Sequence, residues 1–208
     1  MKLYTCSGAP SPRRVTLFLE LKGIAIDQVE VDLRSGEHLS DEFAAKSPDC
    51  TVPVLELDDG SCLWETNAIR RFLEEQNPEP ALYGSGLHER AEINQWTDWV
   101  FTHGLLAVME AFRNRSSGFR DHALTGRRPV AQISELAVRG RERFGHFLGD
   151  LDQRLQQTTW IGGESLSVAD IDALVTIDFA ARAIKLEPDS SLESLARWYQ
   201  AMSDQIEK

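Results

Sequence analysis

The chain has 208 residues, of which 42% are hydrophobic and 26% are charged. This composition supplies enough apolar material for a folded core and excludes a wholly disordered chain. With 22 basic and 33 acidic residues, the formal net charge is −11, so we expect neither a nucleic-acid-binding surface nor binding to an anionic membrane. The apolar runs in the sequence are far shorter than the roughly 20 residues that span a bilayer.

The beginning of the chain does not resemble an export signal, because Pro10 and Pro12 interrupt it before a hydrophobic region could form. The cysteines are Cys6, Cys50 and Cys62; they form no C-x-x-C pair, and their odd number does not fit a disulfide framework. The five histidines show no metal-ligand spacing. We therefore expect a cytoplasmic protein without a metal site.

Residues 1–80 alternate between the periodicity of strands and that of helices. Asp59-Gly60, between two β-prone runs, predicts a hairpin turn. The predicted elements are, in order, a strand over 3–6, a helix over 15–22, a strand over 24–31, a short helix over 41–45, a hairpin over 52–64 and a helix over 66–76. This order, β-α-β followed by β-β-α, is typical of an α/β domain.

Helix-breaking residues at 77–80 and 84–86 separate this part from the rest. We predict a first domain over 1–80, a linker over 81–87 and an all-helical domain over 88–208. Within the helical part, apolar residues recur at helical spacing along two long segments, 93–107 and 133–155. Ser167 and Asp170 have the spacing of a capping box that begins a further helix.

Three segments of the first domain carry residues suited to a small polar ligand. Pro12 lies near a helix start, where its missing N–H costs nothing, so free backbone donors and the positive end of the helix dipole favour an anion or a thiolate. Val52-Pro53 opens a strand, and a cis bond there would turn the Val52 backbone outward. Glu65 and Thr66 precede a helix, where they could bind the ammonium and carboxylate groups of an amino acid.

With these three segments in this order, followed by a helical half, the whole chain resembles the cytosolic glutathione transferases. The resemblance implies an α/β thioredoxin-like N-terminal domain plus an all-α C-terminal helical bundle, which together make the glutathione transferase fold. It also implies glutathione as the co-substrate and a homodimer. The matching segments are Arg13-Arg14-Val15, Gly36 to Phe43, Thr51 to Val54, Glu65 to Ile69 and Ser167 to Asp170.

Carried over from the family, the resemblance assigns a role to each residue of the glutathione site. Val52 would exchange backbone hydrogen bonds with the cysteinyl unit, and Pro53 would be cis. Glu65 and Thr66 would hold the γ-glutamyl end. His38, in a segment that resembles the theta class, would approach the glycyl carboxylate.

The residue that activates the thiol is where the sequence departs from the family. Ala9 stands where theta- and delta-like enzymes have a catalytic Ser, and Pro10 stands where the beta class has a Cys. Ser11 is the nearest hydroxyl, at the position where nu-like bacterial relatives have an Asn. The pattern from Gly8 to Val15 also looks like an atypical fungal group whose thiolate is stabilised by the helical domain.

Energies indicate that Ser11 could activate the thiol. Lowering a thiol pKa from about 8.5 to about 6.5 requires roughly 2.7 kcal/mol. A hydrogen bond to a charged group supplies about 1.5–3 kcal/mol, and a helix N-terminus adds roughly 0.3–1 kcal/mol. We therefore predict that the Ser11 hydroxyl and the amides of the first helix stabilise the thiolate without a general base.

The favoured function is detoxification by transfer of the glutathione thiolate to a small apolar electrophile. Trp99, His103, Phe112 and Phe119 are candidates for lining the acceptor pocket. A second hypothesis, favoured by the absence of Ser or Cys at position 9, is that the protein is a glutathione-dependent disulfide or peroxide reductase. A third is a non-catalytic binding module that keeps the fold for partner recognition.

Overall fold

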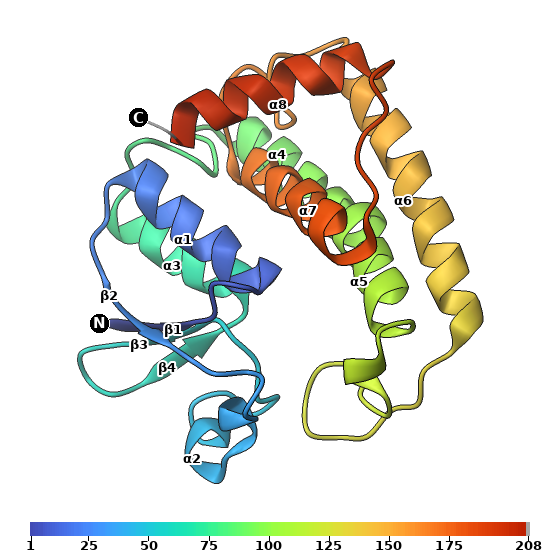
Figure 1. The fold of residues 1–208 in the computed structure, drawn as a ribbon. Helices are drawn as coiled ribbons and strands as arrows, with labels where there is room; N and C mark the ends of the chain where they lie inside the picture. Colours follow the sequence, from blue (N-terminus) through green and yellow to red (C-terminus); the bar gives the residue numbers. More distant parts are fainter. Residues whose placement is uncertain (207–208) are drawn as a thin grey trace. The chain divides into compact units, whose positions relative to one another are not determined.

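The structure, a computed structural model, describes residues 1–206 and divides into two compact units (Figure 1). The first unit contains Met1–Pro80 and also Leu124–Val130, and the second contains Ala81–Ala123 and the chain from Ala131 onward. The short segment over 124–130 falls within the range that the sequence assigned to the helical domain. It therefore joins the first unit through contacts between residues that are distant along the chain.

The first unit is built on a mixed sheet with the strand order β2-β1-β3-β4. Strand β2 is parallel to β1, whereas β3 is antiparallel to both β1 and β4. Helices α1 and α3 lie together on one side of the sheet in Figure 1. The elements are β1 (Lys2–Thr5), α1 (Pro10–Lys22), β2 (Asp27–Glu30), the 3-10 turn η1 (Glu37–Leu39), α2 (Asp41–Ala44), β3 (Val54–Glu56), β4 (Cys62–Trp64) and α3 (Thr66–Gln76).

Helix α1 begins five residues before the helix predicted over 15–22. Its first residue is Pro10, and it ends at Gly23, whose φ of 65° is the left-handed conformation that glycine adopts without strain. The apolar periodicity starts only at Val15, but proline is well suited to the first turn of a helix because its φ is already helical. The predicted bound at residue 15 was therefore too late, whereas Pro12 lies near the helix start as predicted.

Strand β2 is shorter than the strand predicted over 24–31. The backbone N–H of Ile24 donates to the carbonyl of Leu19, 2.9 Å away, so the residues after Gly23 still close the end of α1. The side chains of β2 itself are exposed, as expected for an edge strand. Val31, directly after it, is buried with Phe43 and Val54.

The strand register brings the ends of several strands together at one edge of the sheet. Tyr4 pairs with Val54, and Val54 pairs with Trp64. The C-terminal end of β1, the start of β3 and the end of β4 therefore lie side by side. Because β2 is parallel to β1, it also ends at this edge.

The second unit is helical. Most of α7 is buried, with side chains from Val168 to Ile184 in the core. On α6, Phe144, Phe147, Leu151 and Leu155 are buried as the periodicity predicts; Ile133 is 51% exposed because it precedes the helix. The elements are α4 (Leu87–Trp99), a π-helical turn (Val100–Leu105), α5 (Leu106–Arg113), a 3-10 turn (Ser117–Phe119), α6 (Ser134–Leu155), α7 (Val168–Ile184) and α8 (Glu193–Ile206).

The predicted capping box forms at the start of α7 and is part of a larger buried network. One carboxylate oxygen of Asp170 accepts hydrogen bonds from the backbone N–H and the hydroxyl of Ser167, both at 2.9 Å. The other accepts from the backbone N–H of Ile161 at 2.8 Å and from the indole of Trp198 at 2.9 Å. Asp170 thus joins α7, α8 and the turn before α7 within the second unit.

No helix among residues 1–206 is both long and apolar enough to cross a membrane.

Candidate functional site

Every residue predicted for the glutathione site belongs to the first unit. Ser11 lies in the first turn of α1, and Val52 and Pro53 precede β3. Glu65 and Thr66 form the turn from β4 into α3. These segments follow or precede the strand ends that the register aligns, so the sheet brings them to one edge.

The first turn of α1 offers fewer backbone donors than the sequence analysis assumed. Pro10, Ser11 and Pro12 are its first three residues, and proline has no N–H. The next N–H, that of Arg13, donates to the carbonyl of Ala9 at 3.4 Å. Ser11 therefore supplies the one free amide among the first three helical residues, and the expectation of several free amides was wrong.

The hydroxyl of Thr66 donates a hydrogen bond to the carbonyl of Ser11, 3.2 Å away. Thr66 is the first residue of α3, and its side chain is buried. This bond ties the first turn of α3 to the first turn of α1. The structure therefore brings together Thr66 and Ser11, to which the sequence analysis gave separate roles.

Glu65 has an unusual backbone conformation, with φ 73° and ψ 124°. A positive φ in a residue other than glycine costs about 1–3 kcal/mol and persists where the surroundings impose it. Glu65 is exposed and makes no side-chain cap for α3. The turn from β4 into α3 therefore holds the backbone of this exposed residue in a conformation that costs energy.

The Val52–Pro53 peptide bond is cis, as the resemblance implies. The ladder between β1 and β3 ends at the pair of Tyr4 and Val54, so the backbone of Val52 lies beyond the paired strand residues. Its side chain packs against the cluster of Val31, Phe43 and Val54. The Val52 backbone is therefore anchored from one side while remaining outside the ladder.

His38 lies in the turn η1, between β2 and α2, and is half-buried. Acidic side chains organise this connection. Glu37 accepts a hydrogen bond from the backbone N–H of Asp32 at 2.7 Å. The backbone N–H groups of Ser35 and Arg34, which both donate to Asp32, lower the pKa of that exposed carboxyl. Asp32 and Glu37 thus fix the backbone of the chain that leads to His38.

An ion pair that the sequence analysis did not anticipate lies beside this connection. Arg127, in the segment over 124–130, contacts Asp41 of α2 with 2.6 Å between Nη2 and Oδ1. The surrounding stretch over 113–129 is polar and shows no periodicity, so no local signal indicated that part of it packs on the first unit. In contrast, the small number of free amides in the first turn of α1 could have been predicted, because Pro10 and Pro12 are visible in the sequence.

The four acceptor-pocket candidates lie in the second unit in two aromatic groups. Trp99 stacks on His103 and on Phe147, with ring centroids 5.4 and 5.1 Å apart. Phe112 makes edge contacts with Phe119 and Phe179. The structure does not bring the two pairs of candidates into direct ring contact.

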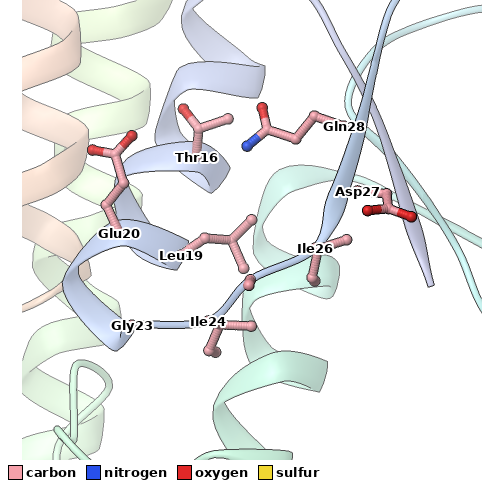
Figure 2. A pocket seen from close by; sticks show the side chains of 9 residues that line it. Thr16, Leu19, Glu20, Gly23, Ile24, Ile26, Asp27 and Gln28 are labelled. Carbon is pink, nitrogen blue, oxygen red and sulfur yellow. The ribbon is translucent and has the colours of Figure 1, made fainter.

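Two adjoining hollows lie on the side of α1 that faces β2. The larger, about 350 Å³, is lined by Leu19, Glu20, Ile24 and Gln28 among others (Figure 2). The smaller, about 280 Å³, includes Cys6. The residues predicted for the glutathione site line neither hollow, so these hollows are distinct from the candidate site.

Comparison with known proteins identifies the family. Residues 9–76 match the family model described as glutathione S-transferase, N-terminal domain, and residues 105–205 match glutathione S-transferase, C-terminal domain. Glutathione S-transferase 2 of Saccharomyces cerevisiae is 31% identical over 204 residues, which cover 97% of this chain and 85% of that protein. The chain belongs to the glutathione S-transferase family.

Solved structures of glutathione S-transferases share the fold over the whole chain. The crystal structure of Gtt2 from Saccharomyces cerevisiae has a TM-score of 0.90 at 30% identity, covering 100% of this chain and 99% of that one. A glutathione S-transferase domain-containing protein from Marinobacter aquaeolei VT8 has a TM-score of 0.91 at 32% identity, covering 99% and 100%. The predicted fold class is confirmed, and the protein is a glutathione transferase with glutathione as its co-substrate.

Proposed function

We propose that this transferase joins the glutathione thiolate to small apolar electrophiles and that Ser11 stabilises the thiolate. The observation that carries the proposal is the position of Ser11, which offers both a hydroxyl and the free amide of the first turn of α1. The thiolate sulfur attacks an electrophilic carbon, the new carbon–sulfur bond forms, and a leaving group such as chloride departs with the electron pair. No general base is needed once the thiol is ionised.

The remaining site residues would bind glutathione so that its sulfur lies near Ser11. The backbone of Val52, fixed by the neighbouring Pro53, would pair with the cysteinyl unit. Glu65 and Thr66 would hold the γ-glutamyl end, Glu65 by its carboxylate and Thr66 by its backbone N–H at the start of α3. His38 would approach the glycyl carboxylate.

Ser11→Ala tests the activation step. Loss of a hydrogen bond to a charged group is expected to raise the apparent pKa of bound glutathione by about 1–2 units. The rate of conjugation to a chlorinated aromatic acceptor at pH 6.5 should then fall about 10–100-fold. An unchanged pKa and rate would remove Ser11 from the mechanism and direct attention to Arg113, Asn114, Ser116 and His122.

A second candidate activity is reduction of disulfides or peroxides by glutathione. The observation that favours it is Ala9, which caps α1 without a side-chain hydrogen bond at the position of the usual catalytic Ser. Parallel assays with a chlorinated aromatic acceptor and with hydroxyethyl disulfide separate the two activities. Turnover of the disulfide alone would favour the reductase, and retention on immobilised glutathione without any turnover would favour a binding module.

We propose further that the protein is a cytoplasmic homodimer that acts in detoxification. Support comes from the family and, for the compartment, from the odd number of cysteines, which are free at positions 6, 50 and 62. Light scattering coupled to size exclusion measures the mass in solution. A monomer at micromolar concentration would contradict the dimer. The domain division into 1–80, 81–87 and 88–208 stays a prediction.

A further inference from the structure

Arg127 is held against the first unit by close backbone packing. Its neighbour Gly126 has a φ of +102°, and a Cβ at this glycine would lie 3.3 Å from the carbonyl oxygen of Asp49. A side chain at position 126 would therefore be strained and crowded. The glycine allows the segment over 124–130 to approach the turn before β3 and places Arg127 beside it.

The ion pair between Arg127 and Asp41 does not explain why the segment packs there. The Arg127 side chain is 47% exposed and the Asp41 side chain is 95% exposed. Exposed pairs of this kind contribute little to stability. A guanidinium has five N–H donors, and one hydrogen bond, from Nη2, is made to Asp41, so Arg127 retains the capacity to bind a second carboxylate.

The position of Arg127 relates it to the proposed glutathione site. Asp41 follows His38 by three residues in the chain. The neighbouring Gly126 lies against the carbonyl oxygen of Asp49, and Asp49 precedes Val52 by three residues. Arg127 therefore lies between the two segments to which the proposed function assigns the glycyl and cysteinyl units.

The charge around this position favours a role for a cation in binding an anionic ligand. Between β2 and the end of α2 the chain carries four acidic residues, Asp32, Glu37, Asp41 and Glu42, and one basic residue, Arg34. Lys46, which follows α2, is engaged with Glu56 at 2.6 Å. A carboxylate that approached His38 would therefore meet an excess of negative charge on this stretch, which Arg127 would reduce.

We propose that Arg127 binds the glycyl carboxylate of glutathione and that Asp41 occupies the same guanidinium when glutathione is absent. The proposal rests on the proposed function, because it requires glutathione to lie along the segments of His38 and Val52. It makes Asp41 a competitor of the ligand. Two variants that break the same ion pair should consequently change glutathione affinity in opposite directions.

Calorimetric titration of glutathione tests this directly. Arg127→Ala should raise the Kd about 10-fold, because a charge-assisted hydrogen bond to the ligand is lost. Asp41→Asn should lower the Kd about 3-fold, because a competing negative charge is removed. Arg127→Lys should fall between wild type and Arg127→Ala, since lysine keeps the charge but not the bidentate geometry. Changes of the same sign in Arg127→Ala and Asp41→Asn would overturn the proposal.

Glutathione esterified at its glycyl carboxylate provides the second measurement. The ester should bind wild type and Arg127→Ala with similar Kd values, because the group that Arg127 recognises is blocked. Arg128→Ala, which removes a neighbouring exposed cation, is the matched control and should leave the Kd for glutathione unchanged. An equal loss in Arg128→Ala would show a general charge effect and overturn the proposal.

The same titrations separate failure of this inference from failure of the proposed function. If wild type gives no heat with glutathione, the proposed site itself is wrong. If wild type binds glutathione while Arg127→Ala binds it equally well, only the role of Arg127 is wrong. Thermal unfolding of each variant shows that the protein is folded in the titration.

Discussion

The Thr66 hydroxyl and the Ser11 carbonyl, 3.2 Å apart, join the N-terminal turns of α3 and α1. One of these residues is proposed to hold the γ-glutamyl end of glutathione and the other to stabilise its sulfur. Their hydrogen bond fixes the relation between two parts of the site that are 55 positions apart in the chain. A change at Thr66 should therefore affect both glutathione binding and the chemistry at Ser11.

Thr66→Val keeps the shape of the side chain and removes this hydrogen bond. We expect a loss of about 1 kcal/mol in the free energy of unfolding, together with a weaker affinity for glutathione. Thr16→Val is the matched control, because the Thr16 hydroxyl also donates to a backbone carbonyl, that of Arg13 at 3.2 Å, within α1. Urea unfolding and glutathione titration of both variants should show similar stability losses but a weaker affinity in Thr66→Val alone.

Pro12→Ala should make the first turn of α1 a better site for a thiolate. Alanine restores the N–H that proline lacks at the third helical position. One added donor at a helix N-terminus is expected to lower the apparent pKa of bound glutathione by roughly 0.2–0.7 unit. The pH dependence of conjugation measures this shift. Pro78→Ala, outside the helices, should leave the pKa unchanged, and an upward shift in Pro12→Ala would contradict the proposed position of the sulfur.

Two variants of Glu65 distinguish the effect of its positive φ on stability from the effect of its carboxylate on glutathione binding. Glu65→Gly and Glu65→Ala both remove the carboxylate, so both should weaken glutathione binding. Glycine adopts a φ of 73° freely whereas alanine does not, so the glycine variant should be more stable by about 1 kcal/mol. Equal free energies of unfolding for the two variants would show that the backbone at position 65 is not strained.

Asp170 should be the most sensitive position of the second unit. Asp170→Ala leaves four hydrogen-bond donors without their acceptor, and we expect a loss of about 3–5 kcal/mol in the free energy of unfolding. Trp198→Phe removes one of the four bonds and should cost about 1.5–3 kcal/mol. Urea denaturation at neutral pH measures both. A smaller effect in Asp170→Ala than in Trp198→Phe would contradict a central role for the carboxylate.

Cys62 should react slowly with thiol reagents at pH 8. Burial raises the pKa of the Cys62 thiol, and the nearby Glu56 carboxylate raises it further, against the opposing effect of Lys46. At a pH below its pKa, a thiol with a raised pKa has a smaller thiolate fraction than an unperturbed thiol. The alkylation rate of Cys62 should therefore continue to rise at alkaline pH values where the rate of an unperturbed thiol has already levelled off. Iodoacetamide labelling of a Cys6→Ser, Cys50→Ser variant measures this rate. The same variant in urea, which should react faster, is the control.

Local signals in the sequence predicted much of the first unit. Helix α3 has the predicted bounds, Thr66–Gln76, because apolar periodicity and the break at Asn77-Pro78 coincide. The Asp-Gly turn between β3 and β4 lies where it was predicted, with Gly60 at a φ of 85°. These features depend on residues close together in the chain, so local sequence patterns were sufficient to predict them.

Other features depend on contacts that the sequence does not display. The conformation of Glu65 and the bond between Thr66 and Ser11 arise only when the strand ends meet at one edge of the sheet. The segment that carries Arg127 has no periodicity, and its association with the first unit depends on Asp41 and Asp49, which are distant in the chain. The start of α1 was different, because Pro12 already indicated a helix start near it, while the predicted bounds followed the apolar pattern from Val15.

The membership of Leu124–Val130 in the first unit has a consequence for protein engineering. A fragment that ends at Pro80 would contain all four strands and yet lack the peptide that covers the Asp49 turn. Chimeras that exchange helical halves at the interdomain break would replace that peptide with a foreign loop. If Arg127 binds glutathione as proposed, grafting residues 124–130 along with the sheet should preserve the donor's affinity for glutathione.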